Sequence, residues 1–264
     1  MRNLITRSIS GLVYAVIFIS AILFSAETYI GLLAIFTAIC IFEFSKIIKL
    51  KSYIPYIVLT FIVYCLITNK ESKTYSFLLA ASLISLTIFL YQLITSKTIH
   101  YSKIGQKVFL QFSYLILPFF FLMGMPFING VYHSNIIIAI ILIIWTNDSF
   151  AFIVGKNFGK NKLFEKVSPK KTIEGFIGGL VFSIIAGLII SKYITLFNTT
   201  NWIIIAIIVS IFGTLGDLVE SKFKRQAKIK DSGNIMPGHG GLLDRLDSLF
   251  FLAPFVYLYI HYII

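Results

Sequence analysis

The amino-acid sequence predicts an all-α polytopic membrane protein with about nine transmembrane helices, its N-terminus in the cytoplasm and its C-terminus outside. Of its 264 residues, 58% are hydrophobic and only 13% are charged, whereas soluble domains carry about 25% charged residues. The apolar residues also form long unbroken blocks, and a helix needs roughly 20 such residues to cross a bilayer. This composition leaves no room for a separate soluble domain.

Nine apolar blocks are expected to be spans, and their order along the chain sets the topology. They lie near 8–25, 29–48, 53–68, 75–95, 108–128, 135–154, 174–191, 202–219 and 246–263. The first block follows two arginines, as a signal peptide does. It exceeds the usual signal-peptide core of about 7–15 apolar residues, so we expect it to stay as the first helix.

The basic residues indicate which ends of the spans face the cytoplasm. With the N-terminus inside, 20 of the 23 lysines and arginines fall in inside segments, and only Lys70, Lys73 and Lys192 fall outside. Positive charge marks cytoplasmic loops. The net charge of +12 therefore requires no nucleic-acid partner, and anionic lipid headgroups are its natural neighbours.

Two parts of the chain differ in chemistry. Residues 1–130 contribute about five spans and few charges. Residues 131–264 form the expected catalytic region, with cytoplasmic loops at 155–174 and 220–246. Eight of the eleven acidic residues lie in or beside these loops, and the topology places them at one membrane face. Ionisable groups beside a span are costly to keep there, so such a cluster indicates function.

Four of these acids are expected to converge. Asp148 and Asp217 end their spans at the cytoplasmic face, and Asp244 and Asp247 open the last span three residues apart, on one face of a helix. Carboxylates from neighbouring helix ends suit Mg²⁺, which takes a few carboxylates together with waters and phosphates. The alternative is that Asp244 and Asp247 only cap the helix N-terminus, where acids are favourable.

Glycines and basic residues next to these acids indicate a phosphate site. The GHGG segment, Gly238 to Gly241, lets a backbone approach a ligand closely and leads into a helix N-terminus. The lysines and the arginine just upstream add positive charge, although the positive-inside rule explains most of them. His239 fits a phosphate donor or a turn residue better than a general base. Together these features are typical of phosphoryl or nucleotidyl transfer.

The loop at 155–174 repeats this chemistry. Its glycines and lysines do not match the P-loop spacing. SPKKTIEG, from Ser168 to Gly175, predicts an extended segment that enters a helix, with Thr172 as the cap. Ser168, Lys170, Lys171 and Thr172 would then hold phosphates or a headgroup. Close helix packing would by itself explain the glycines that follow.

The segment SKFKRQAKIKDSGNIMPGHGGLLDRLD, Ser221 to Asp247, resembles the signature of phosphatidate cytidylyltransferases, also called CDP-diacylglycerol synthases. It has the Ser, Lys-Arg, Lys-Asp, His-Gly-Gly and Asp-Arg-x-Asp elements at the family spacings, with Met236 as a mild departure. NDSFAFIVGKNFGK, SPKKTIEG and GDLVES resemble the stretches that precede the signature. The likeness covers about 100 residues of the C-terminal half.

The resemblance implies that the chain transfers the cytidylyl group of CTP to phosphatidic acid, releasing pyrophosphate. It implies a multi-pass protein of the inner cell membrane whose active site faces the cytoplasm, and it implies Mg²⁺ as cofactor. A second cation and a homodimer are left open. The expected metal ligands are Asp217, Asp244 and Asp247. The other expected catalytic residues are Lys224, Arg225 and His239. The expected substrate contacts are Asp148, Ser168, Lys170, Lys171, Thr172, Ser221, Lys230, Asp231, Gly240, Gly241 and Arg245.

Two other functions remain to be weighed. A CTP-dependent kinase of dolichol or another isoprenoid alcohol would share the metal and the nucleotide but would release CDP, and the complete signature disfavours it. A transporter would carry acids near the bilayer centre in paired halves. The sequence has no matching halves, and its acids gather at one face.

Overall fold

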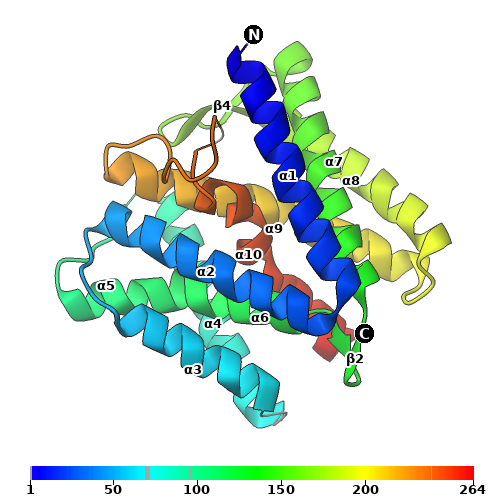
Figure 1. The fold of residues 1–264 in the computed structure, drawn as a ribbon. Coiled ribbons are helices and arrows are strands. Elements are labelled where there is room, and N and C mark those ends of the chain that lie inside the picture. Colours follow the sequence, from blue (N-terminus) through cyan, green and yellow to red (C-terminus); the bar gives the residue numbers. More distant parts are fainter. Residues whose placement is uncertain (1, 69–71, 96, 239) are drawn as a thin grey trace.

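The computed structural model describes residues 2–68, 72–95, 97–238 and 240–264, and within them the chain is a bundle of helices (Figure 1). The elements are α1 (Arg2–Phe24), α2 (Ala26–Ile48), α3 (Ile54–Thr68), α4 (Ser72–Ile94), α5 (Ile104–Gln111), η1 (Phe112–Ile116), α6 (Leu117–Gly124), β1 (Phe127–Ile128), β2 (Val131–Tyr132), α7 (Ser134–Phe158), β3 (Lys162–Phe164), β4 (Ser168–Thr172), α8 (Ile173–Tyr193), α9 (Thr199–Gln226), α10 (Leu243–Leu258) and η2 (Tyr259–Ile263).

The predicted class of an all-α polytopic membrane protein is confirmed. Because α5, η1 and α6 run on as one helix and α10 continues into η2, the described residues form nine helical segments. Seven of them are long and apolar enough to cross a membrane, and Ile9–Phe24 and Ile54–Thr68 are shorter apolar helices. The π-helical turn η1 ends two residues before Pro118, which has no N–H to donate to the preceding turn.

The loops of the C-terminal half are shorter than the sequence predicted. The first begins only at Gly159, since α7 extends to Phe158, and the second spans 227–242, since α9 extends to Gln226. Glu220 and Lys224 support the extension of α9, because they form an ion pair one turn apart on the helix. Charged residues that were expected in a loop therefore lie on the last two turns of α9.

The segment before α8 is extended, as predicted. β3 and β4 pair antiparallel, with Lys162 opposite Thr172 and Phe164 opposite Ser168. Thr172 is the N-cap of α8, and its hydroxyl accepts a hydrogen bond from the Gly175 N–H. The hairpin is joined to the end of α9 by Arg225, so it lies beside the loop at 227–242.

The packing of α9 against α10 positions the site. The two helices lie side by side, α8 packs on α9, and α7 packs on α8. The rings of Phe44, Tyr114, Phe223 and Phe250 contact one another and join α2, η1, α9 and α10. This buried aromatic cluster holds the end of α9 and the start of α10 at a fixed spacing.

Candidate functional site

Three carboxylates meet where α9 and α10 pack together. Oxygens of Asp217, Glu220 and Asp247 lie within 4.8 Å of one another. Gly216 allows this approach, because a Cβ there would lie 2.6 Å from the Cβ of Phe251 and 2.9 Å from the carbonyl oxygen of Asp247. A glycine at 216 is therefore needed for the acids of the two helices to meet.

Two lysines contact these acids, each on a different carboxylate. The Lys171 ammonium, at the end of β4, lies 2.5 Å from an oxygen of Asp217, and the Ser221 hydroxyl donates to the other oxygen at 3.1 Å. Lys224 is paired with both Glu220 and Asp244, with 2.6 Å to the latter. The lysines thus offset part of a dense negative charge.

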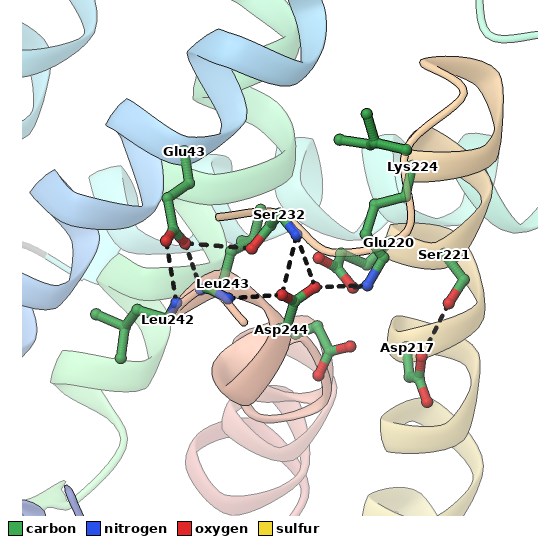
Figure 2. A network of polar contacts seen from close by, with 12 residues as sticks. Glu43, Asp217, Glu220, Ser221, Lys224, Ser232, Leu242, Leu243 and Asp244 are labelled. Carbon is green, nitrogen blue, oxygen red and sulfur yellow. Dashed lines mark hydrogen bonds and ion pairs between the residues drawn. The ribbon is translucent and has the colours of Figure 1, made fainter. Parts of the chain in front are cut away.

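Asp244 has a different environment from the three clustered acids. Its carboxylate accepts hydrogen bonds from the N–H groups of Ser232, at 2.9 Å, and Gly241, at 2.8 Å, as well as from Lys224 (Figure 2). Gly240 has a positive φ of 93°, and its carbonyl accepts from the Met236 N–H. Asp244 therefore joins the loop at 227–242 to α9 and α10.

A cavity of about 540 Å³ opens beside these groups. Its lining combines charged residues with apolar residues of α1 and α7. The charged lining residues are Asp148, Asp217, Lys224, Asp231, Asp244, Arg245 and Asp247. The apolar lining residues of α1 and α7 are Gly11, Tyr14, Ala15, Phe18, Ile141, Ile144 and Trp145. Such a cavity suits a ligand with a polar and an apolar end.

The other expected substrate contacts fall into two groups. Asp148 lines the cavity and accepts a 3.3 Å hydrogen bond from the Asn147 side chain, which is held in turn by Ser210. Thr172 is engaged as a helix cap. The expected residues that lie outside the cavity lining are Ser168, Lys170, Lys171, Thr172, Ser221, Lys230, Gly240 and Gly241.

Two expected catalytic residues, Arg225 and His239, are not found among the clustered acids. Arg225 makes other contacts, and His239 lies outside the described residues. The Arg225 guanidinium donates to the main-chain carbonyls of Val167 and Ile229, so it links the hairpin to the following loop. The role of His239 stays a prediction.

Sequence reasoning missed two acids that the structure brings to the site. Glu220 was not singled out, although it lies three residues after Asp217 and therefore on the same helix face. Glu43 was not among the expected site residues, yet it accepts hydrogen bonds from Ser232 and from the start of α10. An acid within an apolar span was the available signal for Glu43.

The clustered acids have the chemistry of a divalent-cation site. Glu220 is fully buried, and its Oε1 has no hydrogen-bond partner among the described residues. A buried carboxylate oxygen without a donor is costly unless something neutralises it. Three carboxylates with such an oxygen match the hard oxygen ligands that Mg²⁺ prefers. Asp217 and Asp247 of the expected metal set belong to this cluster, and Asp244 lies beyond Lys224 with both oxygens engaged.

Comparisons with known proteins give one consistent result. A model of the cytidylyltransferase family matches residues 5–263. The phosphatidate cytidylyltransferase of Bacillus subtilis is 31% identical over 267 residues, covering 97% of each chain. Those of Staphylococcus saprophyticus and Staphylococcus aureus are 52% and 53% identical over 115 residues. These last two matches cover 43% of this chain and 44% of each relative, less than half of their length.

Proposed function

The chain is a member of the cytidylyltransferase family, and we propose that it transfers the cytidylyl group of CTP to phosphatidic acid, giving CDP-diacylglycerol and pyrophosphate. The observation that carries this proposal is the cavity whose lining combines charged and apolar residues. A nucleotide triphosphate and a lipid phosphate require the charged groups. The acyl chains require an apolar path, and the α1 and α7 residues of the lining supply one from the bilayer side.

The proposed reaction needs positioning more than proton abstraction. An oxygen of the lipid phosphate attacks the α-phosphorus of CTP. The bond from that phosphorus to the oxygen bridging to the β-phosphate breaks, and pyrophosphate leaves. The lipid phosphate is already an anion, so no strong base is required. Lys224 and Arg245 line the cavity and offset the charge of two anionic substrates, an electrostatic contribution that preorganised groups make efficiently.

Mg²⁺ is the proposed cofactor, with Asp217, Glu220 and Asp247 as the residues that would hold it. When bound, the ion would neutralise triphosphate charge and stabilise the leaving pyrophosphate. Lys171 contacts Asp217 and orients that carboxylate toward the cluster. Asp244 holds Lys224, so its proposed part in the metal site is indirect. A second cation is not required by this arrangement.

The proposed location is the inner cell membrane, with the cavity facing the cytoplasm. The distribution of lysine and arginine supports this orientation, and CTP is a cytosolic nucleotide. The same orientation puts the N-terminus inside and the C-terminus outside. Fusion of a reporter enzyme to each terminus tests this orientation. A reporter that is active only in the cytoplasm should be active when fused to the N-terminus and inactive when fused to the C-terminus.

A turnover assay on detergent-purified protein tests the reaction. The mixture contains phosphatidic acid, Mg²⁺ and CTP labelled at the α-phosphate, with EDTA and Asp217→Asn as controls and Lys192→Ala as a matched surface variant. We expect label in the lipid fraction, stoichiometric pyrophosphate, and loss of both with EDTA and Asp217→Asn. Folded protein that leaves the lipid unlabelled would refute the proposal. Label passing from γ-labelled CTP to an isoprenoid alcohol would instead identify a kinase.

A further inference from the structure

The first turn of α10 is held by a carboxylate from a distant helix. Glu43, near the end of α2, is 1% exposed. Its Oε1 accepts from the Leu242 N–H at 3.2 Å. Its Oε2 accepts from the Leu243 N–H at 2.8 Å and from the Ser232 hydroxyl at 3.3 Å. Figure 2 shows Glu43 pointing from α2 toward the loop and the start of α10.

Two glycines form a cradle around this carboxylate. A Cβ on Gly241 would lie 2.6 Å and 2.7 Å from the two oxygens of Glu43. The three atoms closest to a Cβ on Gly233 all belong to Glu43, with its Cδ at 3.0 Å. Gly241 belongs to the GHGG segment, from which a phosphate contact was expected, and Gly233 lies five residues before that segment. In the structure, their lack of side chains makes room for an internal carboxylate.

The contact between Glu43 and the start of α10 satisfies the hydrogen-bonding groups on both sides. The first N–H groups of a helix have no partner within the helix and carry partial positive charge, so an anion is favourable there. A buried carboxylate, for its part, requires donors. Since Leu242 and Leu243 donate to Glu43, and Gly241 donates to Asp244, these three N–H groups are already used. The start of α10 therefore has an internal anion where a substrate phosphate was expected.

We propose that Glu43 is a positioning residue that fixes the N-terminus of α10, and with it Asp244 and Asp247, beside the cavity. The proposal rests on the proposed cytidylyl transfer. Asp244 directly follows Leu243 and Asp247 lies one turn later, so a shift of the first turn moves both carboxylates. Glu43 thereby connects the N-terminal helices to the acids of α9 and α10, which gives α2 a role in the reaction.

Glu43→Gln tests the proposal with little change in volume. The amide replaces one acceptor oxygen by an NH₂ donor, which faces an N–H donor of α10. We expect kcat to fall about 100-fold, the order of loss that a misplacement of about 1 Å produces, while KM for CTP stays within about threefold. Glu27→Gln, an exposed acid at the opposite end of the same helix, is the matched control and should leave both constants unchanged.

Limited trypsin digestion separates positioning from general destabilisation. Lys228 and Lys230 are exposed in the loop that Glu43 anchors, and Lys162 and Lys166 are exposed in the hairpin region. Glu43→Gln should speed cleavage at the first pair at least about tenfold, because the opening free energy of the loop falls, and should leave the second pair unchanged. Equal acceleration at both pairs, or at neither, would overturn the proposal.

A double-mutant cycle distinguishes loss of the contact between Gly233 and Glu43 from general misfolding. Gly233→Ala alone should lower kcat, because its Cβ displaces Glu43. In a Glu43→Ala background the same change should have no further effect, since the atoms that it meets are gone. Additive losses would refute the cradle. If the wild-type protein forms no CDP-lipid, the proposed reaction is wrong, and the same cycle read by loop cleavage still decides whether Glu43 anchors α10.

Discussion

Replacing Lys224 by methionine should destabilise the protein by about 3–5 kcal/mol, the usual cost of removing one partner from a buried ion pair. The Lys224 side chain is 9% exposed, and its partners Glu220 and Asp244 are 0% and 9% exposed. Methionine keeps the length and the apolar stem. The loss would therefore come from two carboxylates left without their shared cation, beside Asp217 and Asp247.

The free energy of unfolding is measured by denaturant titration in mixed micelles, with EDTA present. Glu220→Gln in the Lys224→Met background should recover at least about 1 kcal/mol, because it removes one unpaired charge and the two sites are coupled. Lys166→Met, at an exposed position, should change stability by less than about 0.5 kcal/mol. A Lys224→Met protein as stable as the wild type, or a double variant that is no more stable than the single one, would refute the assignment of Lys224 as the counter-charge of the cluster.

Three further predictions follow from packing, capping and topology. Gly179→Ala should lower the free energy of unfolding by about 1–3 kcal/mol, because its Cβ would lie 2.7 Å from the Asn147 side-chain oxygen. Gly31→Ala is the control, since its Cβ meets no atom within 4 Å and should be tolerated. Thermal unfolding of the two variants checks this difference. Thr172→Ala should cost about 1 kcal/mol through loss of the α8 cap, and Thr172→Ser should recover most of it in the same measurement. Lys192→Ala, at an exposed position in the last turn of α8, should leave turnover within about twofold, and a large loss would contradict the proposed topology.

The helices could be predicted because their signal is local. A bilayer requires about 20 consecutive apolar residues per helix, and the nine blocks in the sequence correspond to the nine helical segments of the described residues. The capping of α8 by Thr172 is also local, since cap and first turn lie within four residues. The end of α9 was placed too early because charge was taken as the end of the span, while Lys222 and Lys224 are buried there.

The candidate site could be predicted only in part. Asp217 and Asp247 were expected to meet, since both lie at span ends on one membrane face, and the structure brings them together with Glu220. Arg225 was expected in catalysis because it is basic and near the acids. Its contacts with Val167 and Ile229 depend on where the hairpin folds back, which no spacing along the chain encodes.

By itself, the sequence determined the fold class, the helical segments, the gathering of acids in the C-terminal half and the resemblance to a cytidylyltransferase family. These properties depend on composition, block length and short-range spacing. Only the tertiary structure decided which acids share one cluster, which lysine neutralises them, and that Glu43 reaches the start of α10 from about 200 residues away along the chain. Such contacts arise when helices pack, because packing brings together side chains whose separation in sequence carries no trace of their distance in space.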